Sequence, residues 1–112
     1  MRVVLHPEAR AELRAAALWY EERRPGLGGE FVAEVTAVLE GIATTPRSSP
    51  LWPGVSGTPE PVRRAVMHRF PYLLAFEAHP DYVLVLAIAH GKRRPLYWLA
   101  RSDRPRPSGS DR

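Results

Sequence analysis

Residues 82–90 read Tyr-Val-Leu-Val-Leu-Ala-Ile-Ala-His and contain the longest apolar run in the chain. A strand with one face in water alternates apolar and polar residues, whereas this run is apolar from Val83 to Ala89. An uninterrupted apolar strand is typical of a central strand covered on both faces. The run is also far shorter than the roughly 20 residues that span a bilayer. It therefore predicts a sheet with 82–90 near its centre, and no membrane partner.

Two further strands are expected upstream, at Val62–Met67 and Tyr72–Ala78. The sequence Ala78-His79-Pro80-Asp81 predicts a tight turn from the second of them into 82–90. Before these strands, residues 46–61 contain prolines at 46, 50, 53, 59 and 61, which predicts a loop. Leu51 and Trp52 in the middle of that loop indicate that it packs against the domain.

The first 45 residues predict a short strand followed by two helices. Arg2–Leu5 is a β-branched run that suits an edge strand, and His6-Pro7-Glu8 is typical of a helix start. Arg24-Pro25-Gly26 ends the first helix, and a second is expected to open after Gly28-Gly29 and to stop before Pro46. So short a link predicts an antiparallel hairpin. The expected fold is α+β, in the order β-α-α-β-β-β, with a helical hairpin packed on a small antiparallel-rich sheet.

Apolar residues recur at helical spacing in both expected helices and predict the faces that pack on the sheet. They are Ala9, Leu13, Ala16, Ala17 and Tyr20 in the first helix and Phe31, Val35, Val38, Leu39 and Ile42 in the second. Trp19, Tyr20 and Phe31 are expected in the core.

The length of 112 residues, with 45% hydrophobic residues, suits one compact domain. We expect that domain to span residues 1–101, with a disordered tail at 102–112 that is rich in Pro, Ser, Gly, Arg and Asp. The chain has no cysteine, which excludes a disulfide framework, a thiolate zinc site and a cysteine nucleophile. Met1–Pro7 does not resemble a signal peptide, so a cytoplasmic location is expected.

The net charge of +4 conceals a gradient along the chain. Residues 1–60 carry six basic and eight acidic side chains, whereas residues 61–112 carry ten and four. Fifteen of the sixteen basic residues are arginine, whose planar guanidinium binds phosphate and carboxylate but is a poor general base. The second half is therefore expected to meet an anionic or acidic partner.

The candidate functional groups lie in this basic half. His68, His90 and Tyr97 are candidates for proton transfer, and the four histidines show no metal-binding spacing, so no metal or cofactor is predicted. Strand alternation predicts Arg64 and His68 on one face, with Arg63 and Arg69 on the other. The candidate cations for binding a phosphate or a target are Arg63, Arg64, Arg69, Lys92, Arg93, Arg94 and Arg101.

Three interpretations of this cluster remain open. In the first, the chain cleaves RNA without a metal, with a histidine as base or acid, Tyr97 as acid and arginines on the phosphate. In the second, a basic groove binds an acidic protein surface, with arginines and Trp98 as anchors. In the third, the charges form a solvated edge that keeps the sheet from pairing further.

Short motifs recur in a characteristic order along the chain. Those of the helical half are His6-Pro7-x-Ala9-x-x-Glu12, Trp19-Tyr20-Glu21, Pro25-Gly26-Leu27-Gly28, Phe31-x-x-Glu34-Val35 and Ile42-x-x-x-Pro46. Those of the sheet half are Arg63-Arg64, Phe70-Pro71-Tyr72, Ala89-His90 and Arg94-Pro95-x-Tyr97-Trp98-x-x-Arg101. This ordered set resembles the RelE/ParE superfamily of type II toxin–antitoxin toxins, which includes plasmid stabilisation proteins. The resemblance covers residues 3 to about 101 and implies the same fold.

The resemblance implies a growth-inhibiting toxin that a cognate antitoxin neutralises by wrapping its helical hairpin and sheet. The superfamily contains both ribosome-dependent mRNA endonucleases and poisons of DNA gyrase. Arg64 and Arg93 align with two basic positions of the endonucleases, Tyr97 lies near their terminal tyrosine, and Pro71 takes the place of an arginine. The loss of that arginine favours a ParE-like protein target such as DNA gyrase.

One alternative is a histidine-dependent mRNA interferase, a metal-independent endoribonuclease that cleaves mRNA on the ribosome. The other is an inactive or repurposed family member. The sequence assigns no residues to antitoxin binding.

Overall fold

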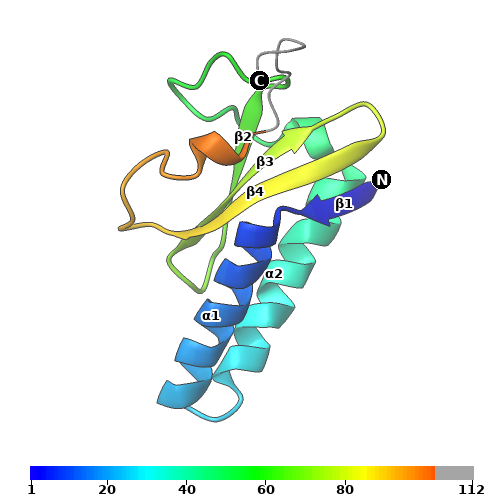
Figure 1. Ribbon diagram of the computed structural model, residues 1–112. Helices are drawn as coiled ribbons and strands as arrows, with labels where there is room; N and C mark the ends of the chain where they lie inside the picture. The colour runs from blue at the N-terminus through cyan, green and yellow to red at the C-terminus, as the bar shows by residue number, and fades with distance from the viewer. Residues whose placement is uncertain (103–112) are drawn as a thin grey trace.

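The computed structural model describes residues 1–102 and has two helices packed on one four-stranded sheet (Figure 1). The sheet order is β1-β4-β3-β2, with β1 parallel to β4 and the other neighbours antiparallel. The expected α+β class and element order are confirmed. The elements are β1 (Arg2–Leu5), α1 (Pro7–Arg23), α2 (Leu27–Thr44), the 3-10 turn η1 (Pro46–Ser48), β2 (Val62–Val66), β3 (Tyr72–Ala78), β4 (Tyr82–His90) and the 3-10 turn η2 (Leu99–Arg101).

Two predicted boundaries were wrong by a few residues. Helix α2 begins at Leu27 rather than after Gly29, because the Glu21 carboxylate of α1 accepts hydrogen bonds from the amides of Gly26 (2.9 Å) and Gly28 (3.0 Å). A carboxylate at this end also meets the positive end of the α2 dipole. Strand β2 ends at Val66 instead of Met67.

The C-terminal boundary also differs from the expectation. Ser102, which was assigned to the disordered tail, is 7% exposed, and its hydroxyl donates a hydrogen bond to the buried carboxylate of Glu77. His79 also contacts this carboxylate, with 2.9 Å between Nε2 and Oε1. The remainder of the predicted tail, 103–112, lies outside the described residues. In residues 1–102 no helix is long and apolar enough to cross a membrane.

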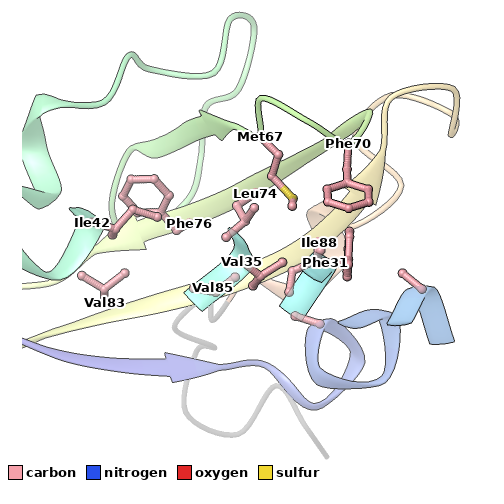
Figure 2. Packing of buried hydrophobic residues seen from close by; sticks show 12 residues of the cluster. Phe31, Val35, Ile42, Met67, Phe70, Leu74, Phe76, Val83, Val85 and Ile88 are labelled. Atoms are coloured by element: carbon pink, nitrogen blue, oxygen red, sulfur yellow. The ribbon is translucent and has the colours of Figure 1, made fainter. Parts of the chain in front are cut away.

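The main core lies between the helical hairpin and one face of the sheet, as Figure 2 shows. Apolar residues at helical spacing in α1 and α2 meet apolar residues of β3 and β4 because both periodicities place them on facing surfaces. Tyr20 packs against Phe31, Phe70 and Tyr72 at ring-centroid distances between 4.8 and 6.3 Å. The buried members are Ala9, Ala16, Phe31, Val35, Ile42, Met67, Phe70, Leu74, Phe76, Val83, Val85 and Ile88.

A second, smaller cluster covers the opposite face of the sheet. Trp98 is 1% exposed there and meets Trp52 of the proline-rich loop edge to face, with ring centroids 4.9 Å apart. The expected packing of that loop is therefore confirmed. The buried members of this cluster are Val62, Ala75, Leu86, Ala87, Ala89 and Trp98. Because β4 contributes to both clusters and pairs with both β1 and β3, the prediction of a central, doubly covered strand is also confirmed.

A β-bulge in β4 changes which side chains face the helices. Phe76 pairs with Val85 and Ala75 pairs with Ala87, so Leu86 is the extra residue. Leu86 and Ala87 consequently both belong to the second cluster, and Ile88 returns to the helical face. The bulge thereby sets the face on which the end of β4 presents its side chains.

Candidate functional site

The last half of β4 has no strand on the side of β1. Strand β1 pairs only with residues 82–85 of β4, and beyond that point side chains form hydrogen bonds with the β4 backbone. Glu12 of α1 accepts a hydrogen bond from the Ile88 amide (3.0 Å), and Arg101 donates one to the Leu86 carbonyl (3.1 Å). These two side chains satisfy backbone groups that a neighbouring strand would otherwise bind.

Glu12 is the centre of a polar cluster that joins α1 to the segment after β4. Besides the Ile88 amide, its carboxylate accepts a hydrogen bond from the Tyr97 hydroxyl (2.6 Å) and forms an ion pair with Arg101 (3.0 Å). The side chains of Glu12 and Arg101 are each 16% exposed, so the pair is largely shielded from water. The negative charge of the Glu12 carboxylate is therefore compensated by Arg101 within the fold.

Tyr97 is held in its protonated form by this cluster. Burial, and next the hydrogen bond to the Glu12 carboxylate, raise the pKa of Tyr97 above its ordinary value of 10.0. The guanidinium carbon of Arg93 lies 4.0 Å from the centroid of the Tyr97 ring, and that of Arg101 lies 5.1 Å from it. The phenol proposed from sequence as an acid thus has its proton committed to Glu12.

His90 lies at the end of β4, with its ring centroid 5.2 Å from that of Tyr72. Its Nδ1 accepts a hydrogen bond from the Lys92 amide (3.0 Å). A neutral imidazole in this arrangement carries its proton on Nε2, so His90 presents a donor rather than a free lone pair. A general base needs that lone pair, so this geometry does not present His90 as one.

His68 and Arg69 lie elsewhere, in the turn between β2 and β3 and against α2. Glu34 accepts hydrogen bonds from both of their backbone amides, and Arg69 forms an ion pair with Glu30 (2.7 Å). The hydrogen bond from Arg69 is the main cause that lowers the pKa of Glu30. Because β2 ends at Val66, strand alternation does not reach His68 and Arg69, and the face predicted for them was wrong.

Arg63 and Arg64 lie at a third place, on the edge strand β2. Arg63 donates hydrogen bonds to the carbonyls of Ser49 (2.8 Å) and Arg47 (3.2 Å), which hold the proline-rich loop. Arg64 is half-buried beside that loop, and within the described chain its Nε has no hydrogen-bond partner. The seven candidate cations therefore form three separate groups. Only Lys92, Arg93, Arg94 and Arg101 lie near the end of β4.

The side chains at the end of β4 border a groove with a volume of about 580 Å³, which we name the β4 groove. Alanines of α1 and Ile88 line it together with three aromatic rings, the half-buried His90 and the exposed Arg93. Its lining residues are Glu12, Ala15, Ala16, Trp19, Tyr20, Pro71, Tyr72, Ile88, His90 and Arg93.

Sequence reasoning missed the contributions of α1 to this groove. Trp19 was expected in the core, but it is 50% exposed, and the guanidinium of Arg23 stacks on its ring at 3.8 Å. Glu12 was quoted only as part of a motif, although a carboxylate in an otherwise alanine-rich stretch was the available signal. Conversely, Trp98 was proposed as an exposed anchor and is buried, because the segment after β4 folds back over the sheet.

The return of that segment depends on one unusual backbone conformation. Leu96 has φ 61°, the only positive φ at a non-glycine residue in the described chain. An L-residue pays about 1–2 kcal/mol for the left-handed region, and burial of its neighbours must offset this cost. The turn directs Tyr97 to Glu12 and Trp98 into the second cluster. Deleting the chain beyond Leu96 therefore removes a core residue as well as surface charge.

A second groove lies on the outer side of the helical hairpin, with a volume of about 590 Å³; we name it the hairpin groove. It is mainly apolar, with Leu18 (59% exposed) and Val32 (38% exposed) in it and two arginines of α1 beside them. Its lining residues are Arg10, Leu13, Arg14, Ala17, Leu18, Glu21, Gly28, Gly29 and Val32. Apolar side chains this exposed at neighbouring positions are typical of protein-binding surfaces.

Comparison with known proteins agrees with the fold described above. One chain of a solved structure described as the chromosomal ParDE toxin–antitoxin system from P. aeruginosa superposes with a TM-score of 0.68 at 18% sequence identity. The match covers 80% of this chain and 95% of the other. No curated protein sequence matches the chain significantly. The family model described as the ParE toxin of the type II toxin–antitoxin system, parDE, matches residues 3–95, and the chain therefore belongs to the ParE toxin family.

Proposed function

We propose that this chain is a toxin that arrests growth by binding a protein target, DNA gyrase, and that a cognate antitoxin neutralises it. Membership of the ParE toxin family and the fold shared with a ParDE system support the toxin and its partner. The action belongs in the cytoplasm, where gyrase works on DNA. We name Lys92, Arg93 and Arg94, which follow β4, the target-binding segment, because their charge suits contact with an acidic target surface.

This proposal rests on the observation that Tyr97 and His90, two of the candidate proton-transfer groups, already form hydrogen bonds within the fold. Metal-independent RNA cleavage needs a base, an acid and cations at one place. Here the Tyr97 hydroxyl is bonded to Glu12 at 2.6 Å, and the His90 Nδ1 is bonded to the Lys92 amide at 3.0 Å. His68 lies at a different corner, against α2. The arrangement suits binding better than proton transfer.

The hairpin groove is the proposed docking site of the antitoxin. Its apolar floor suits an amphipathic segment, and Arg10 and Arg14 suit the acidic tail that the family resemblance implies for an antitoxin. This site lies on α1 and α2, whereas the basic target-binding segment follows β4. In this proposal the antitoxin binds a surface that does not include the cations at the end of β4.

The competing function is a histidine-dependent mRNA endonuclease, and one observation favours it. His90 and Arg93 line the same groove, so one imidazole and one guanidinium can face a common ligand. The third possibility is an inactive family member, which would bind an antitoxin without arresting growth.

The deciding experiment maps mRNA 5′ ends within minutes of inducing the chain without its antitoxin, in parallel with supercoiling by purified gyrase. We expect growth arrest, no new ends and inhibited supercoiling. Arg93→Glu is expected to weaken inhibition, because it reverses an exposed charge of the target-binding segment. Arg2→Glu is the matched control, since it makes the same change on β1, beside the opposite end of β4.

New ends at defined codon positions that depend on translation would contradict the proposal. If they also disappear in His90→Ala, the chain is the endonuclease. Loss of a proton-transfer group costs about 10²–10⁴-fold in rate, so that loss would be unmistakable. A chain that binds its antitoxin but never arrests growth would identify the inactive form.

A further inference from the structure

The β4 groove has a composition that differs from its surroundings. Small and aliphatic side chains, Ala15, Ala16 and Ile88, line it together with the rings of Trp19, Tyr20 and Tyr72. Trp, Tyr and Arg are the residue types most enriched where protein interfaces concentrate their binding energy.

The charges that face the groove are positive once the internal ion pair is taken into account. Glu12 lies in the lining, but Arg101, Tyr97 and the Ile88 amide already bind its carboxylate. Arg93 remains exposed, and it is positioned by stacking on the Tyr97 ring. The Nε2–H of His90 adds a neutral donor, as its bond from the Lys92 amide requires.

A second guanidinium lies at the rim of the groove. Arg23 stacks on Trp19 at 3.8 Å and donates to the Trp19 carbonyl at 3.4 Å, one helical turn earlier. The half-exposed indole is thereby fixed at the mouth of the groove at little cost in side-chain entropy on binding.

From this geometry we infer that the β4 groove binds an acidic segment of the target protein. One apolar or aromatic side chain of that segment enters between Trp19 and Ile88, and a neighbouring carboxylate meets Arg93 and His90. The inference rests on the proposed function for the protein nature of the target, and it specifies the site and its ligand chemistry.

A protein segment fits better than RNA for two reasons. Single-stranded RNA binding combines a cationic track along the backbone with stacked bases. Among the described residues one guanidinium, that of Arg93, lines this groove together with the Glu12 carboxylate, and Arg23 adds a second through its stacking on Trp19. Two separate cations beside a carboxylate do not form a cationic track, and alanine and isoleucine make up much of the remaining lining. An apolar anchor with one carboxylate uses the groove fully.

The β4 groove is separate from the hairpin groove, although both use α1. Leu18 and Trp19 are adjacent in sequence and point into different grooves, because successive helical residues differ by about 100° in direction. Glu12, Ala15, Ala16 and Trp19 line the first, and none of them lines the second. Target binding and antitoxin binding can therefore be disrupted independently.

Ala15→Trp tests this inference, because Ala15 is exposed on α1 and a large ring there fills the groove. Ala11→Trp, one helical turn earlier and also exposed, is the matched control outside the groove lining. Each variant is expressed without antitoxin to score growth arrest, and the purified full chain is assayed for binding to gyrase, for antitoxin binding and for its unfolding temperature. We expect Ala15→Trp to lose growth arrest and to bind the target at least about tenfold more weakly, while antitoxin binding persists. Ala11→Trp is expected to behave as the wild type.

Each other outcome overturns the inference in a recognisable way. Growth arrest that persists in Ala15→Trp shows that the groove is not used, and loss of antitoxin binding shows that it belongs to the antitoxin. Translation-dependent mRNA ends that vanish in Ala15→Trp identify an RNA ligand. If Ala15→Trp does not fold, Trp19→Ala removes a half-exposed ring from the groove, and Leu51→Ala, at a half-exposed residue of the proline-rich loop, is its control.

Failure of the proposed function is distinguishable from failure of this inference. Arrest that depends on the groove without inhibition of gyrase removes gyrase as target and leaves the groove as a site for another protein. If the wild type and Ala15→Trp inhibit gyrase equally, the groove is not the target site, whereas the proposed function is retained. A wild-type chain that never arrests growth overturns both.

Discussion

At the scale of single residues, Glu12 has the most consequential contacts of the described chain. It binds a backbone amide of β4, a phenol and a guanidinium, with distances of 3.0, 2.6 and 3.0 Å. Its partners Tyr97 and Arg101 lie more than eighty residues further along the chain. One carboxylate in α1 therefore determines where the C-terminal segment lies.

Tyr97→Phe tests this cluster through the pH dependence of stability. The raised pKa of Tyr97 in the folded chain means that the unfolded chain ionises first, near its ordinary value of 10.0. The stabilising contribution is therefore complete below pH 10 and is lost as the pH rises above it. We expect urea unfolding to show a steeper loss of stability in the wild type than in Tyr97→Phe as the pH rises from about 10 to about 11.

At neutral pH the same variant is expected to lose about 1 kcal/mol, as is typical for one hydrogen bond. Tyr82→Phe, which removes a hydroxyl from the ring that stacks on His79 at the other end of β4, is the control. Identical pH profiles for the wild type and Tyr97→Phe would show that burial and the bond to Glu12 do not keep the phenol protonated in solution.

At the scale of elements, the helical hairpin depends on close approach at one glycine. An ideal Cβ at Gly28 would lie 2.5 Å from the carbonyl oxygen of Ala17 and 3.1 Å from the Cβ of Glu21. The amide of Gly28 also binds the Glu21 carboxylate, so the helices are joined here by both packing and capping. The neighbouring Gly29 has no atom within 4 Å of an added Cβ.

Gly28→Ala and Gly29→Ala form a matched pair for this contact. We expect Gly28→Ala to destabilise the chain by about 1–3 kcal/mol, because backbone of α1 must move to admit the methyl group. Gly29→Ala is expected to stabilise it by about 0.5–1 kcal/mol, since alanine restricts the unfolded chain in a helical position. Denaturant unfolding of both variants measures the difference. Equal effects would mean that the helices are not closely packed at Gly28.

The helices and strands were largely predictable, and a comparison of their predicted and observed bounds shows why. Strands β3 and β4 were placed at their observed bounds, because runs of apolar and aromatic residues and the turn at His79-Pro80 are local signals. The bulge at Leu86 was not predicted, since a continuous apolar run looks the same with or without an extra residue. The start of α2 was missed because its cap comes from Glu21 of the preceding helix.

At the scale of the whole molecule, α1 contributes side chains to both grooves, and these side chains point in different directions. Mass action predicts that an antitoxin bound to the folded chain raises its unfolding temperature in a concentration-dependent way. The proposed docking site predicts which substitution removes that effect.

Leu18→Asp is expected to weaken antitoxin binding by about tenfold or more, because it places a carboxylate in the apolar floor of the hairpin groove. Thermal unfolding with and without antitoxin measures the loss, and growth arrest without antitoxin is expected to persist. Leu51→Asp makes the same change at a similarly exposed leucine on the proline-rich loop and is expected to leave binding intact. An antitoxin that stabilises Leu18→Asp as well as the wild type would place its docking site elsewhere.

Sequence alone was sufficient to predict the α+β class, the order of the elements, the central position of β4 and the family resemblance. All of these follow from periodicity, turn residues and short motifs, which act over a few positions along the chain. Only the tertiary structure decided that the candidate cations separate into three groups, that Trp98 is buried and that Trp19 is exposed. These outcomes depend on a bulge, a left-handed turn at Leu96 and the bonds of Glu12, each of which involves partners distant in sequence or a conformation that composition does not reveal.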